Sequence, residues 1–269
     1  MTGTHYSMLK LARIVLCIGL SAPLFGCYTT KEWTTAHGDV GALGRAASPT
    51  NPNHLGSGAI LLAMPYLLAD DHGLSDDIVE DRPLNTKKWN ADTTQRILAL
   101  SPFGAAALSA VFPDPGYESE ALEVFEVAVE SALITAGLTE LLKAQVGRER
   151  PDPETSSTAS FPSGHVSSSM AGATVTARWL RRKHPAFFSL ELGLYAGVGY
   201  VAFSRIENQG HFPSDTAAGA ILGGYVANTL WDAHFGRDEK EGFFHHMRGN
   251  IYPAVIDDEG LALFWTLQF

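Results

Sequence analysis

Apolar residues gather in six segments of this chain, and their spacing predicts helices. The third segment is the clearest, because apolar side chains recur there every three or four residues while Glu123, Glu126 and Glu130 lie on another side. The second is interrupted by Ser101-Pro102. We therefore expect a mainly α-helical domain. The six segments are Ala59–Leu68, Ile97–Phe112, Leu122–Val146, Val166–Leu180, Leu190–Phe203 and Thr216–Leu230.

The length and hydropathy of these segments argue against membrane-spanning helices. A helix that crosses a bilayer needs about 20 mostly apolar residues. Here the segments are short, Glu191 and Asn228 interrupt two of the most apolar ones, and the mean hydropathy of the chain is only +0.01. A chain of 269 residues that is 45% hydrophobic can bury one sizeable core. We expect one helical domain over residues 54–240.

An acidic stretch between the first two segments is predicted to be a solvated loop. A calcium-binding loop places oxygen ligands at alternate positions around a glycine and ends in a glutamate, and this stretch lacks that register. The acidic residues are Asp70, Asp71, Asp76, Asp77, Glu80 and Asp81.

The N-terminus has the features of an export signal over residues 1–26. Two basic residues, Lys10 and Arg13, precede the apolar run Ile14–Leu24, which ends shortly before Cys27. Leu24-Phe25-Gly26-Cys27 resembles the bacterial lipobox, although the lipobox has a small residue where this chain has Phe25. We expect lipidation of Cys27, with ordinary secretion or an uncleaved anchor as alternatives. Met8 would serve equally well as Met1 as the first residue of the protein.

The rest of the N-terminal region is predicted to be a polar tether over residues 27–53. Because Cys17 lies within the signal, no thiol would remain for a disulfide or a metal. Loss of residues 1–26 would change the formal charge from −10 to −12, which disfavours nucleic acid as a partner. Tyr28 replaces the aspartate that often retains lipoproteins at the inner membrane. In a two-membrane bacterium we therefore expect a periplasm-facing protein at the outer rather than the inner membrane.

The C-terminal residues 241–269 predict a small β-hairpin. Ile251–Ile256 is followed by four turn residues and then by apolar residues at every second position up to Phe269. We expect this hairpin to pack on the helical domain rather than on a membrane, since a single hairpin cannot close a barrel.

The first candidate for chemistry joins the end of a predicted helix to a loop. Lys143 falls near the end of Leu122–Val146, and Arg150 lies beyond it, where Pro151 and Pro153 prevent the helix from continuing. An ammonium is a compact charge and a guanidinium is a planar fork, so together they can neutralise a phosphate dianion. Taken alone, such cations also complement a helix dipole.

The second candidate is Pro162-Ser163-Gly164-His165, which precedes another predicted helix. Ser163 can occupy the N-cap, and the amides that follow it can bind an anion. Gly164 lets a ligand approach the backbone closely, and His165 is placed to give a proton to a departing alkoxide. A plain helix cap with an exposed histidine would explain the tetrapeptide equally well.

The third candidate is Ser204-Arg205, with His211 and Asp215 after it. If Asp215 lies in or just before the first turn of the next helix, its carboxylate can reach one ring nitrogen of His211. The other ring nitrogen would then be free to attack phosphorus. Asp215 alone would also be a good helix-capping residue.

Together these three stretches resemble the motifs of the type 2 phosphatidic acid phosphatase superfamily. This superfamily includes class A acid phosphatases, lipid phosphate phosphatases and vanadium haloperoxidases. The resemblance covers Lys143 to Asp215 by motif and extends to Leu122–Leu230 by helix layout. It implies a helical bundle with the site between the helices.

The resemblance also implies a role for each motif residue in a metal-independent phosphomonoesterase that needs no cofactor. His211 would form a phosphohistidine, Asp215 would orient it, and His165 would protonate the leaving oxygen and later activate water. The substrate would be a phosphate monoester, possibly lipid-linked. A vanadium-dependent haloperoxidase, which would hold vanadate, and a non-catalytic envelope lipoprotein are the alternatives. The implied phosphate-binding residues are Lys143, Arg150, Ser163, Gly164 and Arg205.

Other charged residues near the motifs are predicted to have no role in the site. Arg148 is expected to be a surface charge. The remaining histidines, including His184, His234, His245 and His246, lack a metal-ligand pattern and are expected to be exposed or to cap helices.

Overall fold

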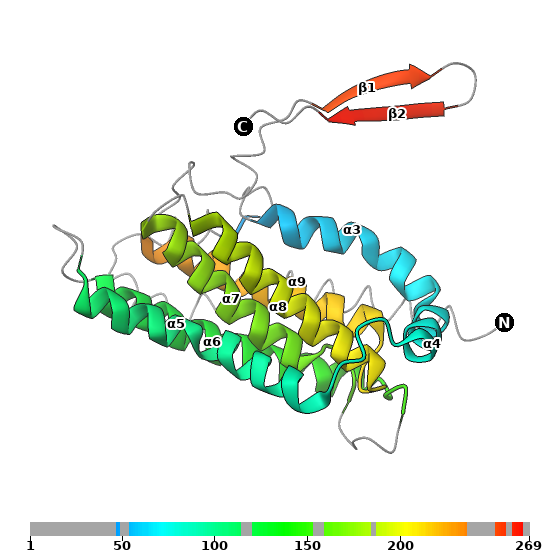
Figure 1. The fold of residues 1–269 in the computed structure, drawn as a ribbon, viewed down its shortest axis with the longest axis horizontal. Helices are drawn as coiled ribbons and strands as arrows, with labels where there is room; N and C mark the ends of the chain where they lie inside the picture. Colours follow the sequence, from blue (N-terminus) through cyan, green and yellow to red (C-terminus); the bar gives the residue numbers. More distant parts are fainter. Residues whose placement is uncertain are drawn as a thin grey trace.

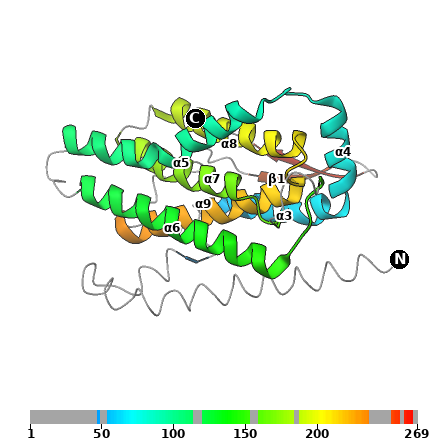
Figure 2. The same ribbon diagram turned by 90° about the horizontal axis from the view of Figure 1, so that it is seen from below.

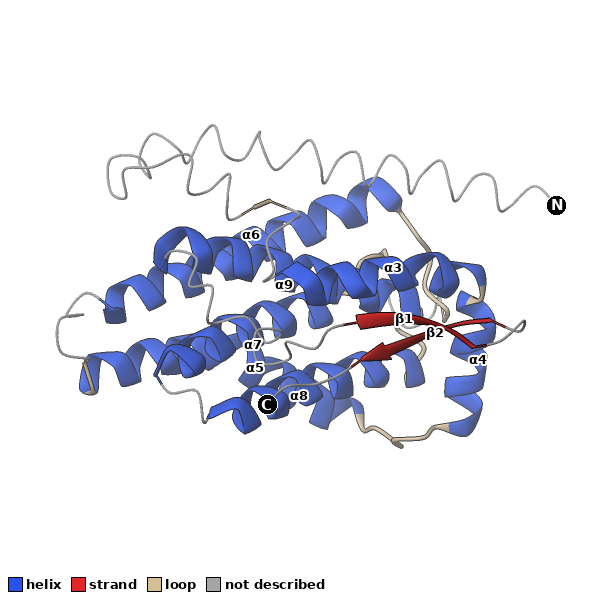
Figure 3. Ribbon diagram, turned by 90° about the horizontal axis from the view of Figure 1, so that it is seen from above, coloured by secondary structure: helices blue, strands red, loops and turns tan. Residues whose placement is uncertain are grey.

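The described part of the chain is mainly helical, which confirms the predicted fold class. The computed structural model describes residues 47–48, 54–113, 120–152, 159–183, 187–235, 251–256 and 260–265. Seven helices lie in these ranges (Figures 1 and 3). The helices are α3 (Leu55–Ala69), α4 (Asp71–Asp81), α5 (Lys88–Val111), α6 (Glu120–Val146), α7 (Gly164–Lys183), α8 (Phe188–Glu207) and α9 (Pro213–Phe235).

Helix α7 is the central helix of the bundle. It packs against α5, α6, α8 and α9, and Figure 2 shows it between α5 and α9. Every residue from Ala171 to Trp179 is buried. Small residues make this possible, because serine, alanine, glycine and threonine dominate the first half of α7 and let neighbouring helices approach on several sides.

Two glycines allow the closest helix contacts. A methyl group on Gly172 of α7 would lie 2.1 Å from the carbonyl oxygen of Leu98 in α5. A methyl group on Gly223 of α9 would lie 2.1 Å from the carbonyl oxygen of Ser167 in α7. Both distances are far inside van der Waals contact, so the packing of α7 against α5 and α9 requires glycine at these positions.

Helix α5 continues through Ser101-Pro102, the pair that interrupts its apolar segment. Proline has no N–H to donate to the carbonyl four residues earlier, which here is that of Leu98. The Ser101 hydroxyl donates to that same carbonyl oxygen at 2.8 Å. The side chain of the preceding residue therefore supplies the hydrogen bond that Pro102 cannot make.

The predicted acidic loop is also wrong, because most of it forms helix α4. This helix buries Asp71 and Ser75 rather than an apolar stripe, so it lacks the periodicity that marked the other helices. It ends where Arg82 adopts the left-handed conformation, with φ 42°.

Helix α6 was predicted correctly, but the face that it buries is not its most apolar one. Leu122 and Leu133, both on the predicted apolar stripe, are each 68% exposed. The buried face instead carries small and hydroxyl side chains, including Ser131, Thr135 and Thr139. The small side chains of α7 favour these neighbours over bulky ones, since α6 packs against α7.

Within the described ranges, no helix combines the length and apolar character needed to cross a bilayer.

Strand β1 (Ile251–Ile256) pairs antiparallel with β2 (Gly260–Trp265), with Ile251 opposite Trp265. The packing of this hairpin stays a prediction, because its side chains lie outside the described residues. The same holds for the signal over residues 1–26, for Cys27 and for nearly all of the tether.

Candidate active site

The three sequence stretches come together at one end of the bundle. Helices α6 and α8 end there, and α7 and α9 begin there, because successive helices run in opposite directions (Figure 1). Lys143 lies in the last turn of α6, and Arg205 lies in the last turn of α8. Gly164 opens α7, and Asp215 lies in the first turn of α9. All eight predicted site residues belong to the described part of the chain.

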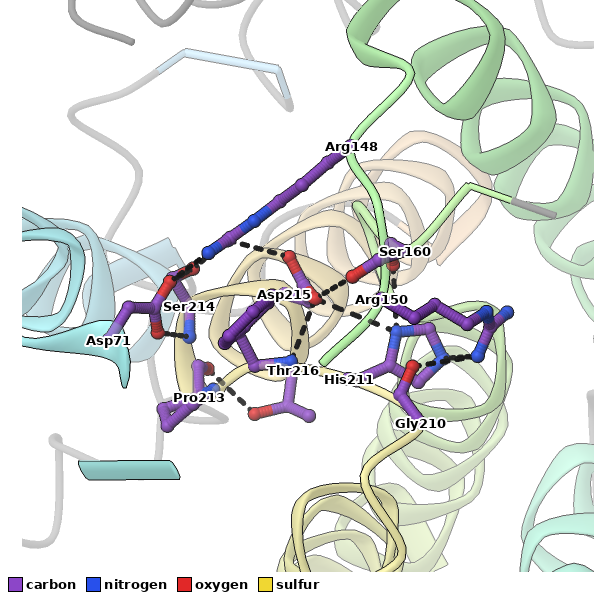
Figure 4. Close-up of polar contacts among 11 residues, drawn as sticks. Asp71, Arg148, Arg150, Ser160, Gly210, His211, Pro213, Ser214, Asp215 and Thr216 are labelled. Atoms are coloured by element: carbon purple, nitrogen blue, oxygen red, sulfur yellow. Dashed lines mark hydrogen bonds and ion pairs between the residues drawn. The ribbon is translucent and has the colours of Figure 1, made fainter. Parts of the chain in front are cut away.

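His211 is buried, with its two ring nitrogens in different surroundings (Figure 4). Nδ1 lies 2.7 Å from the carbonyl oxygen of Ser160. A carbonyl can only accept a hydrogen bond, so Nδ1 carries the proton and Nε2 carries the lone pair. Nε2 lies 3.4 Å from Nη1 of Arg150, which also donates to the carbonyl oxygen of Gly210 at 2.7 Å.

The environment of His211 favours its neutral form. Burial lowers the pKa of the imidazole, the nearby Asp215 carboxylate opposes this, and the charge of Arg150 lowers the pKa further. A neutral imidazole with a lone pair on Nε2 is the form that can act as a nucleophile.

Asp215 acts on His211 less directly than the sequence suggested. Its Oδ2 lies 3.8 Å from Nδ1 of His211, which is too long for a hydrogen bond. The same oxygen instead accepts hydrogen bonds from the Ser160 hydroxyl and, at 2.8 Å, from the backbone N–H of Phe212. Asp215 therefore fixes the two segments that hold the imidazole, and Ser160 is a site residue that the motifs did not include.

Arg148 is not the surface charge that was predicted. Its Nη1 donates to Asp215 Oδ1 at 2.9 Å and to Ser214 Oγ at 2.7 Å, and its Nη2 donates to Asp71 Oδ2 at 2.7 Å (Figure 4). The guanidinium also lies 4.0 Å above the ring of Phe212. A planar fork with several donors is suited to such a position, where a lysine could not replace every contact.

Asp71 links helix α4 to the start of α9. It accepts hydrogen bonds from the backbone N–H of Ser214, at 2.9 Å, and from the Ser214 hydroxyl. The residue lies 77 positions from Arg148 in the sequence, so no local pattern could have revealed the contact.

Ser163 occupies the predicted N-cap position, but its hydroxyl does not cap the helix. The Ser163 carbonyl accepts from the N–H of Ser167 at 3.0 Å, as the first turn of α7 requires. Its Oγ is fully buried and has no hydrogen-bond partner in the described structure. A buried hydroxyl without a partner is costly, so this donor is suited to a ligand.

Lys143 lies over the start of α7. A methyl group on Gly164 would be 3.5 Å from Nζ of Lys143, which shows how close the ammonium is to the backbone at the helix N-terminus. Nζ also pairs with Glu140 at 2.7 Å, and the Glu140 side chain is 71% exposed. The helix N-terminus and the ammonium thus both favour an anion at this point.

Arg205 and His165 share a carboxylate neighbour that the sequence did not reveal. Nη2 of Arg205 donates to Oδ1 of Asp92, on α5, whereas the buried Nε of Arg205 has no partner among the described residues. The same Asp92 oxygen lies 3.8 Å from Nε2 of His165. Burial, and then the charge of Arg205, lower the pKa of His165 to about 4, although Asp92 opposes the shift.

The remaining histidines show no metal site in the described ranges. No group of three or more His, Cys, Asp or Glu side chains could hold a metal there. Of the two roles predicted for His234, exposure is wrong, because its side chain is only 3% exposed and Nε2 pairs with Glu130 at 3.0 Å. It lies in the last turn of α9, where the predicted capping role remains open. His184, His245 and His246 lie outside the described residues.

The site therefore combines cations, unpaired donors and a neutral imidazole. Lys143, Arg150 and Arg205 converge on it, and Ser163 Oγ and Arg205 Nε are buried donors without partners in the described structure. Donors of this kind, at a helix N-terminus, can bind the oxygens of a tetrahedral anion. The lone pair of His211 Nε2 adds a nucleophile to that anion site.

Comparison with known proteins finds similarity to one superfamily. The sequence matches the PAP2 superfamily over residues 127–239, a range that contains every motif residue. Two proteins of Mycobacterium tuberculosis, from strains CDC 1551 / Oshkosh and ATCC 25618 / H37Rv, are each 34% identical over 107 residues. Both are named decaprenylphosphoryl-5-phosphoribose phosphatase. The match covers 37% of this chain and 55% of theirs, so the chain spans about half the length of these relatives.

A solved structure is also similar. The transmembrane PAP2-type phosphatidylglycerolphosphate phosphatase from Bacillus subtilis aligns with a TM-score of 0.47 and 20% identity. The alignment covers 65% of this chain and 93% of that one. Residues 127–239 of this chain are therefore similar to the PAP2 superfamily, and the matched range contains the three motif stretches.

Proposed function

We propose that this protein is a metal-independent phosphomonoesterase that works through a phosphohistidine on His211. The observation that carries the proposal is the Nε2 atom of His211. Because the Ser160 carbonyl fixes the proton on Nδ1, the lone pair is on Nε2, which lies beside the guanidinium of Arg150. A phosphate held by the cations of the site would present its phosphorus to this lone pair.

Substrate binding uses the cations and the unpaired donors. Lys143, Arg150 and Arg205 neutralise the phosphate oxygens, the Ser163 hydroxyl donates to one of them, and the backbone at Gly164 lies beside the phosphate. These groups are held by the ends of helices α6, α7 and α8 and by the loop after α6, so little reorganisation is needed when charge builds up on the oxygens.

In the first step, His211 Nε2 attacks phosphorus and the bond from phosphorus to the ester oxygen breaks. His165 gives its proton to that oxygen, so the alcohol leaves as a neutral molecule. The proton on His211 Nδ1 stays on that nitrogen, which keeps its hydrogen bond to the Ser160 carbonyl. The Asp215 carboxylate balances the positive charge on the imidazole.

In the second step, neutral His165 accepts a proton from water, which attacks phosphorus. The bond between phosphorus and Nε2 breaks, and inorganic phosphate leaves. His165 can accept this proton because it gave up its own in the first step. Burial and the charge of Arg205 lower its pKa to about 4 without a bound anion. A bound phosphate dianion would raise that pKa, so the substrate itself helps to supply the acid for the first step.

The sequence and the relatives support a proposal for the substrate class and the location of the protein. We propose a phosphate monoester, and the name of the Mycobacterium tuberculosis relatives favours a lipid-linked one. The predicted signal and Cys27 anchor would place the site on the periplasmic side of a bacterial envelope. Parallel assays of lipid-linked and soluble phosphate monoesters would identify the preferred class.

The test of catalysis is phosphate release from an aryl phosphate in the presence of a chelator. We expect activity that vanadate inhibits, because vanadate adopts the five-coordinate geometry of the transition state. His211→Gly should be inactive and should regain activity with added imidazole, which fills the place of the missing ring. No release at any pH between acid and neutral would overturn the proposal, and so would full activity in His211→Gly.

The covalent intermediate and the haloperoxidase alternative are tested separately. After rapid quenching without acid, mass spectrometry should detect a phosphoryl group on His211. The fraction of phosphorylated protein should be higher in His165→Ala, because this variant lacks the base that activates water in the second step. Phosphate on another residue would contradict the mechanism. Peroxide-dependent bromide oxidation by the vanadate-loaded protein, without any phosphate release by the metal-free form, would favour the haloperoxidase.

A further inference from the structure

Asp92 places a carboxylate inside a site that otherwise favours anions. It lies on α5, outside the three motif stretches, and its side chain is 33% exposed. Its Oδ1 accepts from Nη2 of Arg205 and lies 3.8 Å from Nε2 of His165. A negative charge at this point weakens the binding of any phosphate, so we expect Asp92 to provide a compensating advantage.

Asp92 does not need to leave when a phosphate binds. It uses one terminal nitrogen of Arg205, and the buried Nε of that side chain has no partner in the described structure. A guanidinium has donors on three nitrogens, so Asp92 and a phosphate can share it. The carboxylate then remains beside the bound substrate.

The backbone that carries Asp92 is held firmly. Its neighbour Ala91 is completely buried, and one turn further along α5 the Gln95 amide donates to the Ser168 hydroxyl of α7 at 2.9 Å. On the other side of the site, Glu207 at the end of α8 accepts from the N–H groups of Leu84 and Thr86, just before α5 begins. The start of α5 is therefore tied to both α7 and α8.

We propose that Asp92 selects substrates by the charge of the leaving group. The inference rests on the proposed function, in which His165 protonates the leaving oxygen. Because Asp92 lies next to His165, its charge lies on the leaving-group side of the phosphoryl group. It repels a leaving group that carries negative charge near the scissile oxygen, such as the second phosphate of a diphosphate ester. Neutral, hydroxyl-bearing or cationic leaving groups are accepted.

The test is a series of aryl phosphates whose phenols have matched pKa values but carry an anionic, a neutral or a cationic substituent. Matched leaving-group pKa values cancel any change in the acid strength of His165. For the native protein we expect kcat/KM to rise from the anionic to the cationic substrate. In Asp92→Asn the ratio of neutral to anionic kcat/KM should fall by at least about fivefold, since the repulsion is gone.

Two further variants control for other effects. Asp92→Glu keeps the charge and should keep most of the preference, whereas Asp76→Asn removes an exposed carboxylate of α4 and should leave the ratio unchanged. A ratio in Asp92→Asn within about 1.5-fold of the native value would overturn the inference. It would leave the proposed function intact, because that function fails only if the native protein hydrolyses no member of the series.

Binding measurements keep the inference testable if Asp92→Asn is folded but inactive. Calorimetry would compare the affinities of the native and variant proteins for inorganic phosphate and for pyrophosphate. We expect Asp92→Asn to gain more affinity for pyrophosphate than for phosphate, because only pyrophosphate places a second charge beyond the cation site. Equal gains for the two anions would overturn the inference.

Discussion

The two ends of the helical bundle both contain buried charges, but they pair them differently. At the end away from the site, Arg178 pairs with Asp232 at 2.6 Å, and Arg181 pairs with Glu191. Each of these carboxylate side chains is only 1% exposed. Buried pairs of this kind are permanent, since breaking one leaves an uncompensated charge in the protein interior.

At the site end two cations keep donors that a ligand can use. Lys143 pairs with Glu140, whose side chain is 71% exposed, so this pair contributes little to stability. Arg205 pairs with Asp92, which is 33% exposed, and its buried Nε has no partner among the described residues. Arg148 and the buried Asp215 form a structural pair here as well. The contrast indicates that the far end uses its charges to hold the fold, whereas Lys143 and Arg205 at the site end remain available to an anion.

Arg205→Met gives the largest expected effect. Removal of this cation should lower kcat/KM by about 10³-fold, which corresponds to about 4 kcal/mol of transition-state stabilisation. Steady-state kinetics with an aryl phosphate measure the loss, and denaturant unfolding checks that the fold is kept. A loss of less than tenfold would mean that Arg205 does not contact the reacting phosphate.

Asp232→Ala should lower stability and leave kcat/KM nearly unchanged, which is the opposite of Arg205→Met. It leaves Arg178 buried without its carboxylate, and we expect the free energy of unfolding to fall by about 3–5 kcal/mol. The kcat/KM of the remaining folded protein should change little, because the pair lies at the other end of α7. The double variant with Arg178→Met should recover much of the stability, and an unstable double variant would argue that the loss comes from packing instead.

Arg148→Met tests the hydrogen bonds by which Arg148 holds Asp215 and the segments around His211. We expect kcat to fall by about 10–100-fold with little change in KM, because Asp215 and the segments that hold His211 lose their fixed position. Glu149→Gln, at an exposed neighbouring position, is the matched control. Should Arg148→Met change KM alone, the side chain would be contacting substrate rather than positioning Asp215.

The protonation of His165 should depend on whether the site is filled. Burial and the charges of Arg205, His211 and Lys143 lower its pKa to about 4 in the empty site, against the effect of Asp92. Between that value and its ordinary pKa of about 6.5, His165 should be neutral in the empty protein. Bound phosphate or vanadate should raise the pKa by about one unit or more, since an added anion favours imidazolium. An NMR titration measures both values, and an empty-site pKa above 6.5 would contradict the arrangement.

Replacing one glutamate by glutamine at each end of the bundle should change stability very little at the site end and more at the far end. Glu140→Gln should change the free energy of unfolding by less than about 1 kcal/mol, because its pair with Lys143 is exposed. Glu191→Gln should cost about 3 kcal/mol, because it removes the charge partner of the nearly buried Arg181. Equal costs in denaturant unfolding would erase the distinction between the two ends.

The sequence was informative where its signals are local. Six helices could be predicted, because apolar spacing reports directly on helical geometry. Helix α4 was missed because it buries Asp71 and Ser75 rather than apolar residues. The buried face of α6 was also unpredictable, since the preference for its hydroxyl side chains comes from the small residues of α7 that pack against it.

The three motif stretches could be recognised from the order of amino acids alone, because their residues are close along the chain and their chemistry depends on residue type. The side chains that surround them come from distant parts of the chain and are brought together by folding. Arg148 contacts Asp215 from 67 residues away, and Arg205 contacts Asp92 from 113 residues away. These contacts depend on which helix ends meet in the bundle. The histidine proposed as the nucleophile was therefore predictable from the sequence, whereas the Arg148 network around it and the nearby carboxylate of Asp92 were not.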